Sequence, residues 1–557
     1  MKQLLFLLFC AVISISEIFA QAAYAPFNRD YYHLLDRYEI LTGASNRHAG
    51  SGFKPYRRDE IAAFVDSLPQ QKQQWTGSDL LNFNYLANDN WEFSTRETPD
   101  SRKPWKGIYK KPSDFFHYRD SVFDVHINPM IYFRGGTVSG EEEEDFQFRN
   151  TRGIEMRGSI DSKVGFYTFL TTTETNLPPW AHAYTQYNGA IPGEGFWKPY
   201  RQSGFSYFSA GGYLTFPVSR HIQAQMGHDR NFVGEGYRSM ILSDFSNPYM
   251  FFKLNTRIWK FNFTNLWGQM NADIIYNRGR PTDGRFPKKW FSFHRLGINL
   301  SPNLNIGLFE SVMSSQLDWN YLNPVIFYRW VEHQLGTPDK VMLGTDFKWN
   351  LLSRIQFYGQ FALDEFVFNE FFGIDGKNSS RNKHGLQLGY KHIDLFKISN
   401  LDLQLEYNQA RPYTYQEKFD YQSYTNYRTP LTHPRGANFR EAVAIIRYQP
   451  ISKLSINATG IYHIYGTDPD ELSNYGGDIL KNRTNQSTGL YGNKIGQGVS
   501  NTMHMGTLNA SYMLGHNIFV DASHTYRKHD IGSGSVQTDN YSQLSLRMNI
   551  SRQEFNY

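Results

Sequence analysis

The chain alternates apolar and polar residues with a period of two over most of its length. In the segment Tyr541–Ile550, Leu544 and Leu546 alternate with Ser545 and Arg547. Such a period gives a β-strand one apolar and one polar face. The clear cases cover 123–127, 164–172, 250–263, 291–300, 354–363, 401–407, 443–448, 454–464 and 518–526. We therefore predict an all-β structure for residues 119–557, and the chain ends on Tyr557, an aromatic residue of the kind that commonly closes the final strand of outer-membrane barrels.

The connections between these segments are of two kinds. Short ones that contain Pro, Asn or Gly occur at 301–303 and 449–452. The long, irregular ones are about 173–203, 365–383, 408–439 and 465–500. In outer-membrane barrels the short turns face the periplasm and the long loops face outward. At about 9–11 residues per spanning strand, the chain provides roughly 16 to 20 strands.

Residues 21–118 follow a helical period instead. Apolar residues recur every three to four positions in 31–41 and again in 56–68, and a third, shorter case lies near 79–86. We predict a small α-helical region at 21–118 that either docks under the barrel or plugs it.

The first 20 residues resemble an export signal. Lys2 precedes an apolar stretch from Leu4 to Ile15, and smaller residues lead to Ala20. The alternative is a short anchor, but the stretch falls short of the about 20 residues that a spanning helix needs. Cys10, the one cysteine of the chain, lies inside this segment. The exported protein therefore has no cysteine for disulfides, thiolate metal sites or nucleophilic catalysis.

The composition distinguishes a barrel from a helical membrane protein. The mean hydropathy is −0.55 and 20% of the residues are charged. A closed β-barrel can cross lipid with such a sequence, because only every second residue must be apolar. Aromatic residues make up 16% of the chain, enough for girdles at both interfaces. We predict an all-β transmembrane barrel of antiparallel strands in the outer membrane, in contact with its lipid; the alternative is a large soluble β-sandwich or propeller. A net charge of +5 gives no case for nucleic acid.

The segment 226–249 concentrates charge among glycines. Its candidate ligand-binding residues are Arg230, Glu235, Arg238 and Asp244. Forked guanidinium donors and carboxylates can hold a polar ligand. The same pairs can equally brace the barrel wall from a loop that folds inward, and the sequence leaves both interpretations open.

Two long loops carry further candidates. The loop 176–203 contains Trp180, Tyr184, Tyr187, Trp197 and Tyr200. Exposed rings of this kind stack on the apolar face of a pyranose, although Trp and Tyr also collect in interfacial girdles.

The loop 408–439 adds Arg428 and Arg435 among several tyrosines. Such a surface suits an anionic polysaccharide or a protein partner, and ordinary loop packing is the alternative.

The sequence offers no catalytic constellation. The pairs Asp364 with Glu365 and Glu332 with His333 are adjacent residues, which point to opposite faces of a strand. We therefore expect no enzyme, no catalytic residue, no cofactor and no metal.

One longer pattern carries a family resemblance. Residues 227–248 read G-x-x-R-N-F-x-G-x-G-x-R-S-x-x-L-S-D-x-x-x-P, which resembles Wzi-type capsule-assembly outer-membrane proteins, in particular their Bacteroidetes branch with the gliding-motility protein RemB. The further matching stretches are NPVIFYRWVEHQLG (323–336), VMLGTDFKWNLLSRIQFYGQFALDEF (341–366) and LTHPRGANFREA (431–442).

The resemblance implies an outer-membrane barrel of about 18 strands with an N-terminal helical bundle. It implies a lectin-like, non-catalytic function in binding or anchoring surface (capsular) polysaccharide. For the gliding branch it implies instead a scaffold for periplasmic or motility-machinery proteins. A general diffusion porin is a third possibility that the charged lumen permits.

Overall fold

The computed structural model describes residues 22–43, 52–68, 75–101, 108–140, 145–272, 286–337, 339–373, 377–532 and 534–557. The predicted export signal, residues 1–20, lies outside the described residues.

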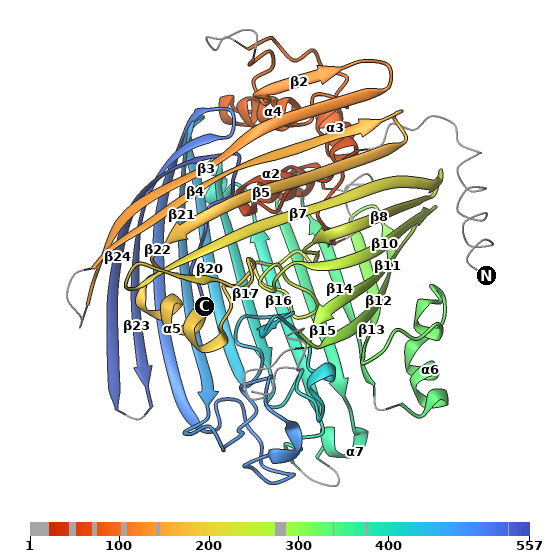
Figure 1. Cartoon of the computed structure of the whole chain (residues 1–557), viewed down its shortest axis with the longest axis vertical. Helices are drawn as coiled ribbons and strands as arrows, with labels where there is room; N and C mark the ends of the chain where they lie inside the picture. The colour runs from red at the N-terminus through yellow and green to blue at the C-terminus, as the bar shows by residue number, and fades with distance from the viewer. Residues whose placement is uncertain are drawn as a thin grey trace.

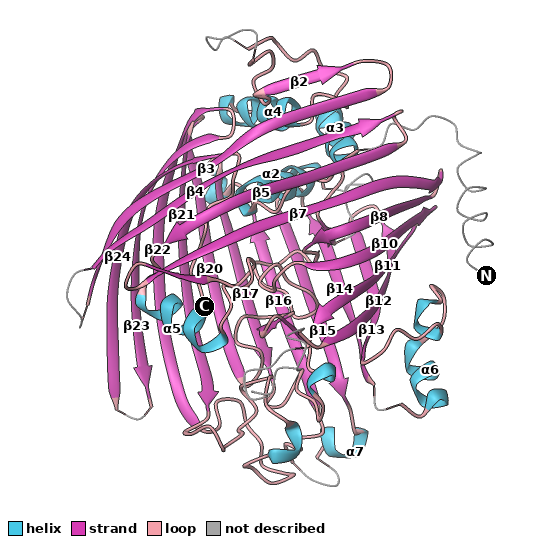
Figure 2. Cartoon of the chain, viewed as in Figure 1, coloured by secondary structure: helices cyan, strands magenta, loops and turns pink. Residues whose placement is uncertain are grey.

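Eighteen antiparallel strands close into one barrel (Figures 1 and 2). The last strand of the wall, β24, pairs with the first, β3, and the register runs from Met548↔Ile131 to Asn540↔Ser139. The wall strands are β3 (Phe123–Ser139), β4 (Asp145–Ile160), β5 (Val164–Thr175), β7 (Gly204–Ser219), β8 (Ile222–Asp229), β10 (Tyr249–Ile258), β11 (Phe261–Asn271), β12 (Lys288–Ser301), β13 (Leu304–Ser314), β14 (Lys340–Leu351), β15 (Ile355–Glu365), β16 (Lys383–His392), β17 (Leu401–Ala410), β20 (Phe439–Ile451), β21 (Leu454–Thr467), β22 (Val499–Gly515), β23 (Ile518–Ile531) and β24 (Ser535–Met548).

The alternating pattern sorts side chains between lipid and lumen. On β24, Leu544 is 64% exposed on the outside, whereas Arg547 is 2% exposed inside and binds Asp521 of β23 through Nε at 2.8 Å. The exterior carries exposed apolar side chains on strands all around the wall, among them Leu170, Phe208, Leu214, Leu308, Leu388, Leu405 and Leu508. The predicted membrane-spanning barrel is thus confirmed. No helix in the described ranges combines the length and apolar character needed to cross a membrane.

Two sequence-based expectations about the strands are wrong. The predicted strand 250–263 is a hairpin, because the chain turns at Trp259, whose φ is 53°. The final strand ends at Met548, and residues 549–557 turn back into the lumen, so Tyr557 does not close a strand.

The short turns gather at one end of the barrel, here the turn end, and the long loops at the other, the loop end (Figure 1). The N-terminal helices α2 (Arg29–Thr42), α3 (Arg58–Ser67) and α4 (Gly77–Asp89) lie at the turn end. The α2 helix begins where the Asn28 side chain accepts hydrogen bonds from the amides of Asp30 and Tyr31, and it ends at Gly43 with φ of 71°. Thr76 and Asp79 form a capping box that starts α4.

The α2 helix is bound to the inner wall by ion pairs. Arg37 Nη1 lies 2.5 Å from Asp402 Oδ1 of β17, and Lys391 Nζ of β16 lies 2.7 Å from Asp36 Oδ2. Burial opposes the charged form of Asp36, but the ammonium groups of Lys391 and Lys54 lower the pKa of its carboxyl to about 2. The helix therefore lies in the mouth of the lumen and is held there by charge pairing.

The remaining elements are short. The added strands are β1 (Phe53–Lys54), β2 (Phe116–Arg119), β6 (Lys198–Tyr200), β9 (Phe232–Val233), β18 (Thr425–Asn426) and β19 (Thr429–Pro430). The loop-end helices are α5 (Pro179–Asn188), η2 (Asn320–Leu322), α6 (Tyr328–Leu335), α7 (Phe368–Phe371), η4 (Asp420–Gln422) and η5 (Arg483–Asn485), and η3 (Leu395–Lys397) lies in the β16–β17 turn.

Candidate functional site

A cavity of about 690 Å³ opens among the loops at the loop end, and we call it the outer pocket. Its volume falls within the range of about 300–1,000 Å³ typical of ligand sites. The α5 helix and the loops after β17 and β21 supply most of its lining. Five sequence-predicted residues line it: Trp180, Tyr184, Tyr187, Arg428 and Arg435.

The three aromatic residues of α5 differ in what they offer a ligand. The Trp180 indole N–H donates to the carbonyl oxygen of Phe555 at 2.9 Å, and its side chain is only 7% exposed. The Tyr184 ring packs edge-on against Tyr557, with ring centroids 5.0 Å apart. Tyr187 is 55% exposed, and its hydroxyl donates to Asp478 Oδ2 at 3.1 Å. Trp180 and Tyr184 therefore form the floor of the outer pocket, while Tyr187 presents a ring to solvent.

The two arginines also differ. The Arg435 guanidinium lies 4.2 Å from the ring centroid of Tyr465, and its Nη2 contacts Met503 Sδ at 4.0 Å. Within the described ranges its Nε has no hydrogen-bond partner and no carboxylate pairs with it. Arg428 donates through Nη1 to the carbonyl oxygen of Asn188 at 3.5 Å. Arg435 thus keeps guanidinium donors for a ligand.

Carboxylates also line the outer pocket. Asp468 pairs with Lys481 at 2.8 Å, whereas Asp470 and Glu471 are exposed. Hydrogen bonds from the backbone and hydroxyl of Ser473 lower the pKa of the Asp470 carboxyl, so it is ionised at neutral pH. Donors and acceptors around one cavity are suited to a ligand with many hydroxyl groups.

A second cavity, the luminal cavity of about 250 Å³, lies deeper in the barrel. Arg230, Glu235, Arg238 and Asp244 line it, and all four lie on the segment 226–249, which folds into the lumen.

These four residues are occupied by partners within the chain. Arg238 Nη2 binds Glu441 Oε1 of β20 at 3.0 Å, and it also donates to the carbonyl oxygen of Asn556. Arg230 Nη1 donates to the carbonyl oxygen of Asp244 at 3.0 Å.

Glu235 lies 3.2 Å from Lys348 Nζ, and Asp244 lies 3.7 Å from Arg29. Through these contacts, the segment 226–249 connects the elements inside the lumen to the barrel wall.

The C-terminal segment 549–557, here the tail, lies between the two cavities. Tyr557 lines both of them. Glu554 accepts from Arg29 at 3.2 Å and from Arg552 at 3.1 Å. Burial disfavours its charged form, but these two guanidinium groups lower the pKa of the Glu554 carboxyl to about 2.

The remaining two predicted aromatics lie outside both cavities. Trp197 packs edge-on against Phe205, with ring centroids 4.6 Å apart. Tyr200 belongs to β6 and packs against Phe148, with ring centroids 6.1 Å apart. Sequence reasoning missed the contribution of the tail and of the loop 468–481. The polar run Ser551–Glu554 after the final strand was the available signal.

The comparisons with known proteins support the fold. No protein-family model and no curated protein matches the sequence. Among solved structures, the chain is similar to Wzi of Escherichia coli, described as a carbohydrate-binding β-barrel involved in group 1 capsule assembly. The match has a TM-score of 0.56 and 13% identity, and it covers 95% of this chain and 100% of that chain.

Two solved structures from Pseudomonas aeruginosa match less well. OprD has a TM-score of 0.39 and 11% identity over 75% of this chain and 94% of its own. OccK8 has a TM-score of 0.42 and 10% identity over 75% of this chain and 97% of its own. The apolar exterior and the closed 18-strand wall make this protein an outer-membrane β-barrel with a Wzi-like fold.

Proposed function

We propose that the protein binds surface polysaccharide in the outer pocket and does not turn it over. The observation that carries the proposal is Arg435, a guanidinium without a carboxylate partner in the described ranges, beside the exposed ring of Tyr187 in one cavity. An aromatic face and charged donors are what a sugar ring with hydroxyl or carboxylate groups requires.

The chemistry of the pocket favours an acidic glycan. Arg435 can form charge-assisted hydrogen bonds to a uronate, each worth about 1.5–3 kcal/mol. The exposed carboxylates Asp470 and Glu471, which line the same cavity, can accept hydrogen bonds from the hydroxyl groups of the sugar. The description of Wzi as a carbohydrate-binding barrel of capsule assembly supports the same ligand class and suggests a capsular polysaccharide.

The test is binding of acidic and neutral polysaccharides to the detergent-folded protein, measured by calorimetry. We expect the wild type to bind acidic polymers saturably and Arg435→Ala to bind roughly 10–100-fold more weakly, as the loss of about 1.5–3 kcal/mol dictates. Arg329→Ala and Tyr491→Ala are matched controls, because both residues are exposed in other loop-end segments and neither lines the outer pocket.

Two outcomes would contradict the proposal. One is a folded wild-type barrel that binds no polysaccharide. The other is binding that Arg435→Ala and Tyr187→Ala both leave unchanged.

A further inference from the structure

Three side chains converge on a hairpin at the turn end. The strand β2 pairs with β3, and the register places His117 directly opposite His126 and Arg119 opposite Asp124. Residues two apart on a strand share a face, so Asp124 and His126 point to the same side. We call His117, Asp124 and His126 the rim cluster. The sequence does not reveal it, because the three residues meet only through the cross-strand register.

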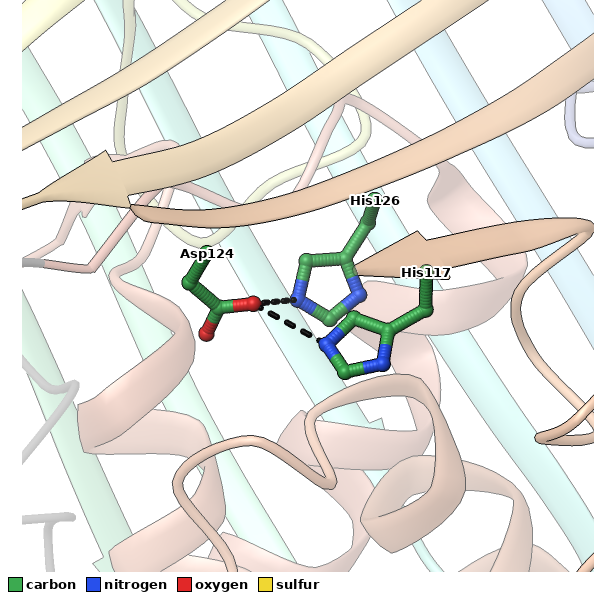
Figure 3. Close-up of side chains that lie close together, drawn as sticks. All are labelled: His117, Asp124 and His126. Atoms are coloured by element: carbon green, nitrogen blue, oxygen red, sulfur yellow. Dashed lines mark hydrogen bonds and ion pairs between the residues drawn. The ribbon is translucent and has the colours of Figure 1, made fainter. Parts of the chain in front are cut away.

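The geometry of the rim cluster is that of a set of metal ligands. His117 Nε2 lies 3.0 Å and His126 Nε2 lies 3.3 Å from the same oxygen, Asp124 Oδ1 (Figure 3). All three ligand atoms lie within 4.8 Å of one another. Tetrahedral zinc with bonds of about 2.0–2.1 Å separates its ligand atoms by about 3.3 Å. A zinc ion therefore fits between the three atoms with small adjustments of the side chains.

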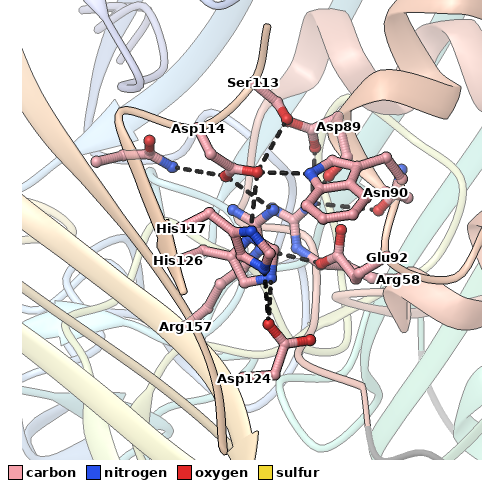
Figure 4. Close-up of polar contacts among 12 residues, drawn as sticks. Arg58, Asp89, Asn90, Glu92, Ser113, Asp114, His117, Asp124, His126 and Arg157 are labelled. Carbon is pink, nitrogen blue, oxygen red and sulfur yellow. Dashed lines mark hydrogen bonds and ion pairs between the residues drawn. The ribbon is translucent and has the colours of Figure 1, made fainter. Parts of the chain in front are cut away.

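A second carboxylate contacts the other ring nitrogen of His126. Asp114 Oδ2 lies 3.0 Å from His126 Nδ1, on the side of the ring away from Asp124 (Figure 4). Asp114 is itself fixed, because the Trp91 indole N–H donates to Oδ2 at 2.6 Å and Arg157 Nη2 lies 3.3 Å from Oδ1.

A carboxylate beside Nδ1 of a histidine whose Nε2 faces the cluster is the usual carboxylate–histidine–metal arrangement. The rim cluster is accessible as well, because the side chains of His117 and Asp124 are 13% and 14% exposed.

We propose that the rim cluster is a zinc site, with His117 Nε2, His126 Nε2 and Asp124 Oδ1 as ligands and water as the fourth. Two imidazoles and one carboxylate are donors that Zn²⁺ accepts. The ion ties the β2–β3 hairpin together beside the Trp91 ring, whose centroid lies 4.8 Å from that of His117. The site would replace the sequence-based expectation that the protein holds no metal.

A second histidine cluster offers an internal competitor. His433, Glu441 and His463 also lie within 4.8 Å of one another, but all three are buried in the lumen. The buried Arg238 guanidinium already pairs with Glu441 at 3.0 Å, so a metal ion there would meet a fixed positive charge. The guanidinium nearest Asp124 in the rim cluster, that of Arg119, lies 3.6 Å away and is 52% exposed, so it can turn to solvent when an ion binds.

The test titrates the full-length, detergent-folded protein, stripped with a chelator, with zinc chloride in a calorimeter. We expect one saturable site, binding at least tenfold weaker in His117→Ala and His126→Ala, and binding roughly 10–100-fold weaker in Asp114→Asn. His221→Ala is the matched control, because His221 lies in an exposed turn at the same end. Cobalt chloride added to the wild type should give the visible absorption of tetrahedral Co²⁺, which His117→Ala removes.

The outcomes separate the alternatives. Absence of saturable zinc binding by the folded wild type overturns the proposal, and so does binding that survives both histidine variants and disappears in His463→Ala. If His126→Ala fails to fold, His117→Ala decides alone, because His117 lies on β2, a strand of 4 residues that pairs with the start of β3 and is not one of the 18 wall strands given above.

Discussion

The luminal cavity and the outer pocket are both lined by arginines and carboxylates, yet their charges are used differently. In the luminal cavity, Arg238 is matched to Glu441 and to the tail carbonyl of Asn556. In the outer pocket, Arg435 faces an aromatic ring and a thioether. A buried guanidinium must be neutralised by its own chain, whereas one at a solvent-open site can remain available to a ligand. The ability of a cavity to bind a ligand therefore depends on the hydrogen-bond donors that the chain itself leaves unoccupied.

Removal of the luminal guanidinium is the most severe test of this difference between the two cavities. Arg238→Met removes the guanidinium from the buried Glu441 carboxylate and leaves it the His433 ring and the Asn408 amide as partners, and we expect a loss of about 3–5 kcal/mol in the free energy of unfolding. Urea unfolding in detergent measures it. Arg435→Met, which strands no carboxylate in the described part of the chain, should change the same quantity by less than about 0.5 kcal/mol.

The double variant Arg238→Met/Glu441→Leu sharpens the test. It should recover most of the loss, because removing both charges removes the unpaired one. Equal stability of wild type and Arg238→Met would show that the luminal pairs do not brace the barrel.

A second, smaller effect concerns pH. The pKa of Glu554 is lowered from 4.5 to about 2 in the folded protein, so its contribution to stability is complete above about pH 4.5 and is lost as the pH falls toward 2. We expect the tail 549–557 to lose protection against hydrogen exchange in this window, after correction for the intrinsic pH dependence.

The variant Glu554→Gln provides the control for that measurement. It should show low tail protection already at pH 7 and little further change on acidification. Wild-type protection that stays constant from pH 5 to pH 3 would disprove the role of Glu554 as the anchor of the tail.

Two substitutions of Tyr187 distinguish the contribution of its ring to polysaccharide binding from that of its hydroxyl group. Tyr187→Phe keeps the exposed ring and removes the bond to Asp478, so we expect acidic polysaccharide to bind at most about threefold more weakly. Tyr187→Ala also removes the ring, whose stacking is worth about 0.5–1.5 kcal/mol, and should weaken binding up to about tenfold. Equal losses in the two variants, measured by calorimetry, would assign the effect to the hydroxyl group.

The wall of the barrel was predictable because lipid imposes one rule on every strand. The alternation of Leu544 and Arg547 follows from an apolar solvent outside and a polar lumen inside. Strand length gave a range of roughly 16 to 20 strands, which contains the observed 18, and the count of about 18 came from the family resemblance. The break at Trp259 was not predictable, because apolar residues continue on both sides of the turn and no Gly or Pro marks it.

The residues that fill the lumen follow no regular period in the sequence. The sequence therefore indicated which residues are candidates, but not which residues they contact. Trp180 and Tyr184 were predicted from an aromatic loop, but the tail covers them, and that contact joins segments about 375 residues apart. The rim cluster was missed for the related reason that cross-strand register decides it.

The binding of α2 inside the lumen also constrains the order of assembly. Arg29, near the start of the helix, pairs with Glu554 across a sequence separation of 525 residues. The closure of β24 on β3 and the insertion of the helix therefore both bring together segments from opposite ends of the chain. Contacts between residues so far apart in the sequence form late and slowly. The helix must already be inside, or must enter together with the tail, when the seam closes. The barrel wall consequently closes around the N-terminal helix of the same chain.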